Sequence, residues 1–226
     1  MARVGRVARL GVTLAVTTLS VVGLATAAQA ESIRDFSVDV QVYDDTAFQV
    51  VETIQYDYEG EYRHGIFRDI PQYDEMLSGQ RRTYGLEVVS VTQDGGIVPF
   101  EVSDNGPFLN LRIGDPNQTI TGVHTYRITY AVRDGLRVLT PDDVADPQAP
   151  AGLSVGDVEL YWDFIGTGWE VPIATARTAV LGPGPALASA CYTGPEGATT
   201  TCAAASARNV VALGPVSLAP GDGLTG

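Results

Sequence analysis

Residues 48–58 read FQVVETIQYDY, and their alternation decides the fold. Apolar and aromatic side chains occupy every second position except one, at Phe48, Val50, Ile54, Tyr56 and Tyr58. Because successive side chains of a β-strand point to opposite faces, this period of two predicts a strand with one buried face. The same alternation occurs in FSVDVQV (36–42) and HTYRITYAV (124–132), which we expect to form two further strands of this kind.

The rest of the chain predicts shorter strands separated by turns. The candidate strands are residues 86–91, 109–113, 159–164, 172–181 and 209–213. Turn sequences such as QDGG, DNG and GTG lie between them. No segment shows a sustained helical stripe, and 25 Gly and 13 Pro suit loops better than helices. The sequence therefore predicts an all-β fold, an antiparallel β-sandwich of the immunoglobulin-like kind.

Glu52 breaks the alternation, since it falls in register with Val50 and Ile54 on the face expected to be buried. An isolated carboxylate is very costly to bury, so it must be paired or protonated. Arg68 is the partner that we expect, because a guanidinium can hold a carboxylate through two hydrogen bonds. The alternative is a β-bulge near Val51 that turns Glu52 to solvent.

The segment YRHGIFRDIP (62–71) places two Arg and one His around a glycine. We interpret it as a corner of the chain. Gly65 would permit a tight turn, and Ile66 and Phe67 would fill the end of the sandwich. Pro71 would end the corner segment.

A rival interpretation makes the same segment a ligand-binding site. His64, Arg68 and Arg112 would form a small site for an anion or a carboxylate, for which Arg is well shaped. Trp169, just after the GTG turn, would either plug an end of the sandwich or face the ligand.

Two cysteines, Cys191 and Cys202, stand at the ends of CYTGPEGATTTC. The residues between them are polar and rich in turn formers, as in a hairpin loop. A redox pair or half of a metal site is the alternative, but two ligands without a nearby His make a poor zinc site. We expect a structural disulfide that closes a hairpin near the C-terminal end.

Length and charge limit the possible functions. The chain has 226 residues, enough for one domain with its own core. It carries 14 basic residues, all of them Arg, against 27 acidic residues, for a net charge of −13. Such a chain repels nucleic acid at long range, and we expect no nucleic-acid partner.

Residues 1–30 predict a signal peptide. Arg3, Arg6 and Arg9 precede a long uncharged stretch that ends in AQA, a small-residue cleavage site. Cleavage after Ala30 would leave an extracytoplasmic domain over residues 31–226. The alternative is an uncleaved membrane anchor, and nothing after residue 30 is long and apolar enough to span a bilayer.

The sequence shows no arrangement that predicts catalysis or a metal centre. Its two histidines, His64 and His124, lack H-x-H or H-E-x-x-H spacing, and no G-x-S-x-G motif occurs. We therefore expect no catalytic residues, no metal and no cofactor.

Four motifs occur in an order and spacing that resemble a known family. They are VETIQYDYEGEYRHGIFRDIP (51–71), LRIGDP (111–116), TGVHTYRITYAV (121–132) and ELYWDFIGTGWEVPI (159–173). The chain resembles the extracytoplasmic N-terminal domain, of unknown function, of the YciQ-like predicted bacterial membrane proteins. The resemblance implies a signal sequence, a β-rich domain and then transmembrane helices, so we expect this chain to be truncated at its C-terminal end relative to the family.

The combined expectation is a non-catalytic extracytoplasmic domain that binds or senses something at the bacterial cell envelope. Its partner would be an envelope protein or a cell-wall ligand. It would be secreted or would lie on the outer face of the cytoplasmic membrane, which it would meet only through regions absent from this chain. The alternatives are an envelope hydrolase with a site near His64 and Arg68, or a purely architectural module.

Overall fold

The computed structural model describes residues 30–44, 46–75, 81–147 and 149–226. The predicted signal peptide, up to residue 29, lies outside the described residues. Within them, regular structure is almost entirely β-strand, and the helix is the single short turn α1 (Pro141–Ala145). The prediction of an all-β fold is confirmed.

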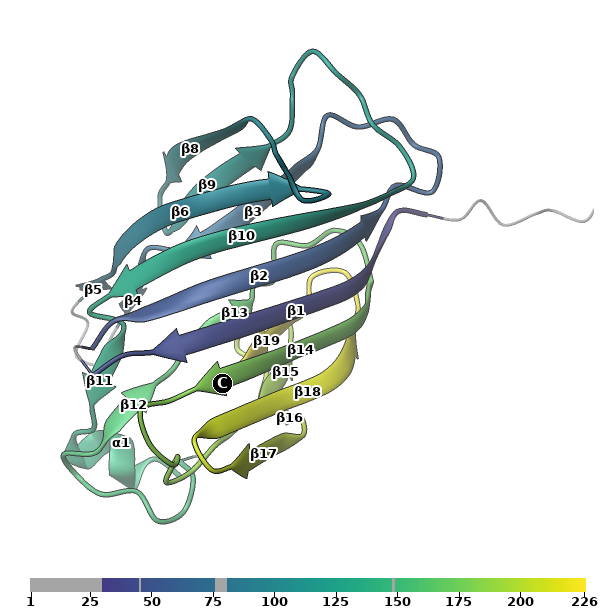
Figure 1. Cartoon of the computed structure of the whole chain (residues 1–226). Coiled ribbons are helices and arrows are strands. Elements are labelled where there is room, and N and C mark those ends of the chain that lie inside the picture. The colour runs from purple at the N-terminus through teal and green to yellow at the C-terminus, as the bar shows by residue number, and fades with distance from the viewer. Residues whose placement is uncertain (1–29, 45, 76–80, 148) are drawn as a thin grey trace, which may run out of the picture.

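One large sheet organises the molecule, and its strands cross the front of Figure 1. It has eight strands in the order β17-β18-β14-β1-β2-β10-β6-β7. Their bounds are β17 (Ala204–Ala207), β18 (Val210–Leu218), β14 (Ile173–Leu181), β1 (Ser32–Val42), β2 (Phe48–Asp57), β10 (Val123–Arg133), β6 (Gly85–Gln93) and β7 (Gly96–Ile97).

Smaller sheets lie behind one face of the large sheet (Figure 1). One has the order β3-β9-β8, and another has the order β13-β19-β15-β16. Two-stranded pairs β11-β12 and β4-β5 complete the described sheets. The bounds are β3 (Ile66–Pro71), β4 (Tyr73–Glu75), β5 (Arg81–Thr83), β8 (Phe100–Asn105), β9 (Phe108–Ile113), β11 (Leu136–Val138), β12 (Val158–Leu160), β13 (Asp163–Ile165), β15 (Tyr192–Gly194), β16 (Thr200–Thr201) and β19 (Gly223–Thr225).

The core lies between the large sheet and the smaller ones. The alternate positions of the three predicted strands are all buried, as their period of two requires: Phe36, Val38, Val40, Val42, Phe48, Val50, Ile54, Tyr56, Tyr126, Ile128, Tyr130 and Val132. The partner register keeps these side chains on one face, since Val40 pairs with Val50, which pairs with Tyr130. Burial of this apolar face is the main source of the stability of the sheet.

The large sheet is mixed, whereas the sequence predicted an antiparallel one. β1 pairs with β2 in the antiparallel sense and with β14 in the parallel sense. Alternation cannot distinguish the two, because the side-chain period is two in both. The immunoglobulin-like topology stays a prediction.

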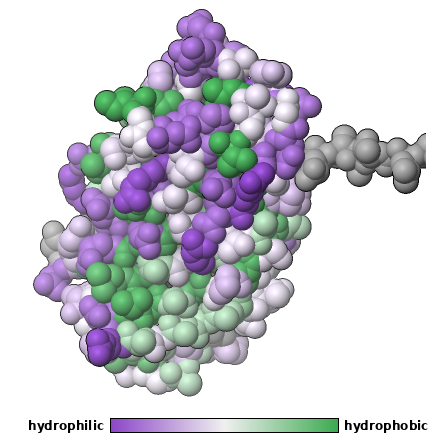
Figure 2. Space-filling model, turned by 45° about the vertical axis from the view of Figure 1, so that its right-hand side comes forward, coloured by the Kyte–Doolittle hydropathy of each residue, from purple (hydrophilic) through white to green (hydrophobic). Residues whose placement is uncertain are grey.

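The sheet ends on one side at β17, whose residues are all exposed. Figure 2 shows hydrophilic residues over the upper part of one face and paler, more apolar residues toward the lower end. β17 lies at this lower end in Figure 1. Its small side chains leave an edge strand with little cover.

The interpretation of YRHGIFRDIP as a corner is wrong. Residues 66–71 form strand β3, which pairs with β9 along its whole length. Phe67 is 63% exposed and does not fill the sandwich end, because alternation directs it outward while Ile66 and Ile70 point to the core. Gly65 precedes the strand with φ +131, and a Cβ built on it would meet the Ile113 carbonyl oxygen at 1.8 Å. Glycine is therefore required where β3 and β9 meet.

The predicted disulfide is present. Cys191 and Cys202 are bonded, with their Cα atoms 5.0 Å apart. They flank the short hairpin of β15 and β16, and the Cys202 amide donates to the Cys191 carbonyl at 2.8 Å. The bridge therefore closes a hairpin near the C-terminal end, where the sequence placed it.

Candidate functional site

The structure brings together Glu52 and Arg68, the two residues predicted to pair. Arg68 Nε donates to Glu52 Oε2 at 2.8 Å, and Arg68 Nη2 donates to Glu52 Oε1 at 2.7 Å. The side chains are 2% and 0% exposed, respectively. The alternative of a bulge that turns Glu52 outward is wrong, because β2 pairs with β1 and β10 without a break at this position.

The groups around the pair complete its hydrogen bonding. Tyr130 donates its hydroxyl to Glu52 Oε1 at 3.0 Å, and Arg68 Nη2 also donates to the Phe164 carbonyl at 3.3 Å. Burial and then the charge of Glu52 raise the pKa of Tyr130 well above its usual value, so its hydroxyl remains a donor. Burial alone would lower the pKa of Arg68, but the Glu52 carboxylate outweighs burial and raises it, so the guanidinium stays charged. Sealed from solvent, the pair joins β2 to β3.

The proposed anion site of His64, Arg68 and Arg112 does not assemble. Arg112 pairs in register with the exposed Phe67, so its side chain lies on the opposite face of the β3-β9 ladder from Arg68. Its guanidinium contacts Glu101 of β8 instead, with Nη2 and Oε1 3.0 Å apart. His64 is exposed, and its Nδ1 lies 3.1 Å from the Gln118 carbonyl oxygen. Neighbouring pairs of the β3-β9 ladder face opposite sides, and this places Arg112 on the other face from Arg68.

Trp169 belongs to the core. It is 8% exposed, and its ring meets the Phe36 ring edge to face, with the ring centres 5.6 Å apart. Its side chain packs against β1, which agrees with the expectation that Trp169 plugs the interior of the sandwich.

A large groove is a candidate binding site that the sequence did not predict. Its volume is about 1230 Å³. Its walls come from the end of β1, from β11, α1, β12 and β13, from β15, and from the segment 183–190. These segments are far apart in the sequence and several are irregular, so neither a period nor a motif marks them.

The groove combines aromatic rings with carboxylates. The rings are those of Tyr43, Tyr73, Tyr84, Phe108, Tyr161, Trp162, Phe164 and Tyr192. The carboxylates are those of Asp44, Asp74, Asp143, Asp146, Asp157, Glu159, Asp163 and Glu196. Arg137 is the one basic side chain among the described lining residues. The chemistry of the groove is therefore acidic and aromatic.

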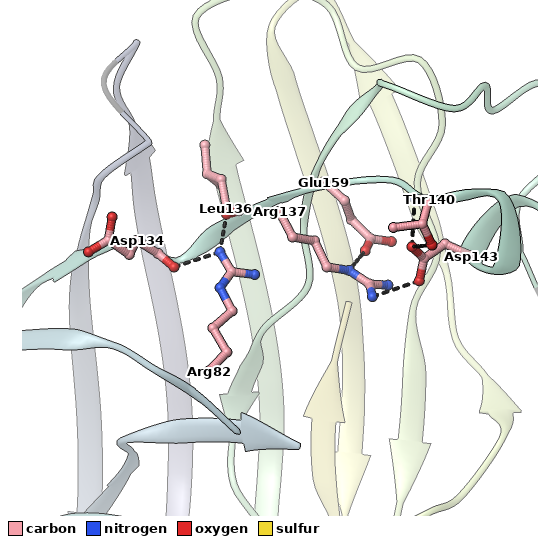
Figure 3. A network of polar contacts seen from close by, with 7 residues as sticks. All are labelled: Arg82, Asp134, Leu136, Arg137, Thr140, Asp143 and Glu159. Atoms are coloured by element: carbon pink, nitrogen blue, oxygen red, sulfur yellow. Dashed lines mark hydrogen bonds and ion pairs between the residues drawn. The ribbon is translucent and has the colours of Figure 1, made fainter. Parts of the chain in front are cut away.

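Arg137 is already engaged by the protein itself, as Figure 3 shows. Its Nε donates to Glu159 Oε2, and its Nη1 donates to Asp143 Oδ1 at 2.9 Å. Asp143 also accepts from the amide and the hydroxyl of Thr140 at 2.7 and 2.6 Å. These bonds lower the pKa of Asp143, those from Thr140 most strongly. The network fixes α1 against β11 and β12 and so shapes one wall.

The same wall is held from the other side by Arg82 of β5 (Figure 3). Its Nη2 donates to the carbonyl oxygens of Asp134 and Leu136, the first at 2.6 Å. The segment that leads from β10 into β11 is therefore tied to β5 through its backbone.

Neither His64 nor His124 lines the groove. His124 lies at the start of β10, where its Nδ1 is 2.7 Å from Asp94 Oδ2. In the described part of the chain, no group of three or more His, Cys, Asp or Glu is arranged to hold a metal ion. Nor does any helix there have the length and apolar character needed to cross a membrane.

Comparison with solved structures finds a shared fold at low identity. Yeast LTA4 hydrolase in complex with bestatin matches with a TM-score of 0.51 and 13% identity, over 86% of this chain and 28% of the hydrolase. Native leukotriene A4 hydrolase from Saccharomyces cerevisiae matches with a TM-score of 0.51 and 12% identity, over 87% and 29%. At this identity the likeness shows the fold alone.

Comparison of sequences identifies the family. The uncharacterized protein YciQ of Escherichia coli K12 is 24% identical over 176 residues, which are 75% of this chain and 25% of YciQ. The chain thus spans about a quarter of the curated relative that it matches. The family described as predicted membrane protein (DUF2207) N-terminal domain matches residues 32–226. The expected resemblance is confirmed, and the chain belongs to this family of predicted membrane proteins, carrying their N-terminal domain.

Proposed function

We propose that the chain is a non-catalytic, extracytoplasmic ligand-binding domain of a bacterial cell-envelope membrane protein, and that the groove is its binding site. The observation that carries the proposal is the groove itself. Its volume of about 1230 Å³ lies above the range of about 300–1,000 Å³ that is common for small-molecule pockets. It is lined by aromatic rings and by polar groups held in place by the protein, as binding sites are.

The location of the domain rests on two observations of different kinds. The family is described as predicted membrane proteins, which supports a parent protein at the membrane. The disulfide between Cys191 and Cys202 supports an oxidising compartment outside the cytosol. Together with the predicted signal peptide, they favour the outer face of the membrane.

The alternative of a hydrolase near His64 and Arg68 has little support in the geometry. A catalytic group must reach the substrate, whereas Arg68 is 2% exposed and both of its terminal nitrogens are engaged. His64 lies beside backbone carbonyl oxygens, and within the described residues it is not paired with a carboxylate or a nucleophile. A purely architectural module would not require the groove.

A thermal-shift screen tests the proposal. The full chain would be melted with a panel of acidic, neutral and basic peptides, muramyl peptides and cell-wall oligosaccharides. Because a ligand that binds only the native state stabilises it, we expect at least one class to raise the melting temperature. The rise should be lost in Tyr161→Ala, since Tyr161 is a partly exposed ring of the groove.

Two results would contradict the proposal. Either no class shifts the melting temperature, or the shift survives unchanged in Tyr161→Ala. Analysis of the peptides after incubation separates binding from catalysis, because cleavage that depends on the groove would make the domain an enzyme.

A further inference from the structure

Resting on the proposed function, we infer that the groove binds a basic peptide segment, one that presents several Lys or Arg side chains to it. This inference deepens the proposal by naming the chemistry of the ligand. It is carried by the charge of the groove, by its exposed rings, by its apolar wall and by its size.

The charge of the groove is strongly one-sided. Eight acidic side chains and one basic side chain line it in the described structure. Arg137, the basic one, is held between Glu159 and Asp143, so the acidic side chains that line the groove outnumber it by eight to one. Like charges gathered on the walls of a concave surface reinforce one another and attract the opposite charge. The complementary ligand is cationic.

Tyr161 marks the place where one cation would bind. Its ring is 47% exposed and lies in the groove. Burial raises the pKa of Tyr161, and the charges of Asp163 and Asp74 raise it further, so these carboxylates are near enough to act on the ring hydroxyl. An aromatic face with carboxylates around it suits an ammonium or guanidinium group, which gains from both.

The protein already makes one such contact beside the groove, through an arginine that does not itself line it. The guanidinium carbon of Arg81 lies 3.8 Å from the centre of the Tyr73 ring, and Tyr73 is a lining residue. A guanidinium thus stacks on one of the tyrosines of the groove within the chain itself. The exposed Tyr161 offers the same chemistry to a side chain from outside.

An apolar segment also lines the groove. The segment GPGPALAS (182–189) lines the groove and includes Leu187, which is 74% exposed. Lys and Arg carry long aliphatic stems that pack on apolar surface while the charged end reaches a carboxylate. A groove with apolar and acidic walls therefore fits these two side chains better than a metal ion or a sugar.

The size of the groove favours a peptide over a single amine. Its carboxylates come from separate elements: Asp74 from β4, Asp143 from α1, Glu159 from β12 and Glu196 from the loop after β15. One small amine would contact few of them. A chain with repeated cationic side chains contacts several at once, and its binding gains from each.

The test is binding of a fluorescent hexalysine peptide to the full chain, followed by anisotropy, with hexaglutamate as the opposite-charge probe. The groove variant is Asp74→Asn with Glu196→Gln. The matched control is Asp39→Asn with Glu170→Gln, two exposed acids that do not line this groove and whose loss changes the net charge equally. We expect the groove variant to weaken hexalysine binding about fivefold to tenfold and the control by less than about twofold.

Tyr161→Leu supplies a second variant that keeps the charge and removes the ring surface presented to a cation. It should weaken hexalysine binding about threefold or more. Raising the salt concentration should weaken binding further, because the contacts are charged.

Three results of the binding assay would overturn the inference. Hexaglutamate binds as tightly as hexalysine, or both pairs of substitutions weaken hexalysine equally, as unspecific attraction to an acidic protein would. The third result is that spermidine, a small amine, binds as tightly as hexalysine. The groove would then recognise amines in general, and a peptide ligand would no longer be indicated. If the thermal-shift panel yields a neutral or acidic ligand that requires Tyr161, this inference fails while the proposed function stands. If nothing in the panel binds, both fail.

Discussion

Arg68 holds both carboxylate oxygens of Glu52, at 2.8 and 2.7 Å, and the two side chains are sealed inside the protein. The contact connects the large sheet, through β2, to the smaller sheet that contains β3. Removing two charges from water is costly, and the pair is tolerated because each nitrogen of the Arg68 guanidinium and both carboxylate oxygens of Glu52 are hydrogen-bonded. Each residue therefore makes the burial of the other possible.

Arg68→Ala should lower the free energy of unfolding by about 3–5 kcal/mol, because it leaves the carboxylate of Glu52 buried without its partner. The double variant Glu52→Gln with Arg68→Met should recover much of the loss, since it removes both charges and fills similar space. Denaturant unfolding measures both.

Arg112→Ala is the matched control. Arg112 is on the neighbouring strand and paired with Glu101, but both side chains are partly or largely exposed. Its removal should change the stability by less than about 1 kcal/mol. Equal losses for Arg68→Ala and Arg112→Ala would contradict a structural role for the buried pair.

The buried pair could be predicted because its signal is local. A carboxylate at an otherwise apolar position of an alternating strand must find a cation, and the sequence offers few cations nearby. The same period of two predicted the three long strands and the buried residues on them. The disulfide could also be predicted, because a chain with two cysteines allows a single pairing.

The groove could not be predicted, because its walls are defined by tertiary packing. Asp74, Tyr161 and Glu196 are separated by long stretches of sequence and come together only when the small sheets pack. The error over residues 62–71 has a related cause. Gly65 indicates a turn when it is considered alone, whereas its function is to permit the close approach of β9, which contributes residues more than forty positions later.

Reduction of the disulfide should lower the free energy of unfolding by about 2–3 kcal/mol, as the chain-entropy estimate gives for a loop this short. The two cysteines are 11 residues apart in the sequence. Thermal melts with and without dithiothreitol measure the effect. The control is Cys191→Ala with Cys202→Ala, whose stability should not respond to the reductant. A wild-type melt that is unchanged by full reduction would contradict the prediction.

Asp143→Asn should destabilise the chain by about 1 kcal/mol at neutral pH, the usual cost of losing a side-chain cap. The hydrogen bonds from Thr140 and the charge of Arg137 lower the pKa of Asp143 below its ordinary value of 3.8. A carboxylate whose pKa is lower in the folded state contributes stability above its unfolded pKa and loses it as the pH falls through its folded pKa. The difference between wild type and variant should therefore be full above about pH 5 and should shrink below about pH 4.

Urea unfolding of both proteins across this pH range checks the prediction. Asp142→Asn is the control, since Asp142 adjoins Asp143 on α1 and makes no hydrogen bond or ion pair among those found in the described structure. A difference for Asp143→Asn that is constant with pH would show that its charge is not what stabilises this wall of the groove.

Gly65→Ala should be among the most destabilising substitutions in the chain. The new Cβ would lie 1.8 Å from the Ile113 carbonyl oxygen, and a Cβ on Gly114 would meet the His64 carbonyl oxygen at the same distance. The two glycines thus permit one mutual close approach of backbones, and neither neighbour is a flexible side chain that can move aside. Gly60→Ala is the matched control, because Gly60 also has a positive φ, +92, but nothing lies within 4 Å of its Cβ. The control should cost about 1 kcal/mol through backbone strain alone. Gly65→Ala should exceed it by about 2 kcal/mol or more, since β3 must shift away from β9. Denaturant unfolding gives both values, and similar losses for the two variants would show that the approach of the strands does not require glycine.

A shift of β3 should also disturb the ion pair between Arg68 and Glu52, because Arg68 lies on this strand. Arg68→Ala added to Gly65→Ala should therefore lower the free energy of unfolding by less than Arg68→Ala alone.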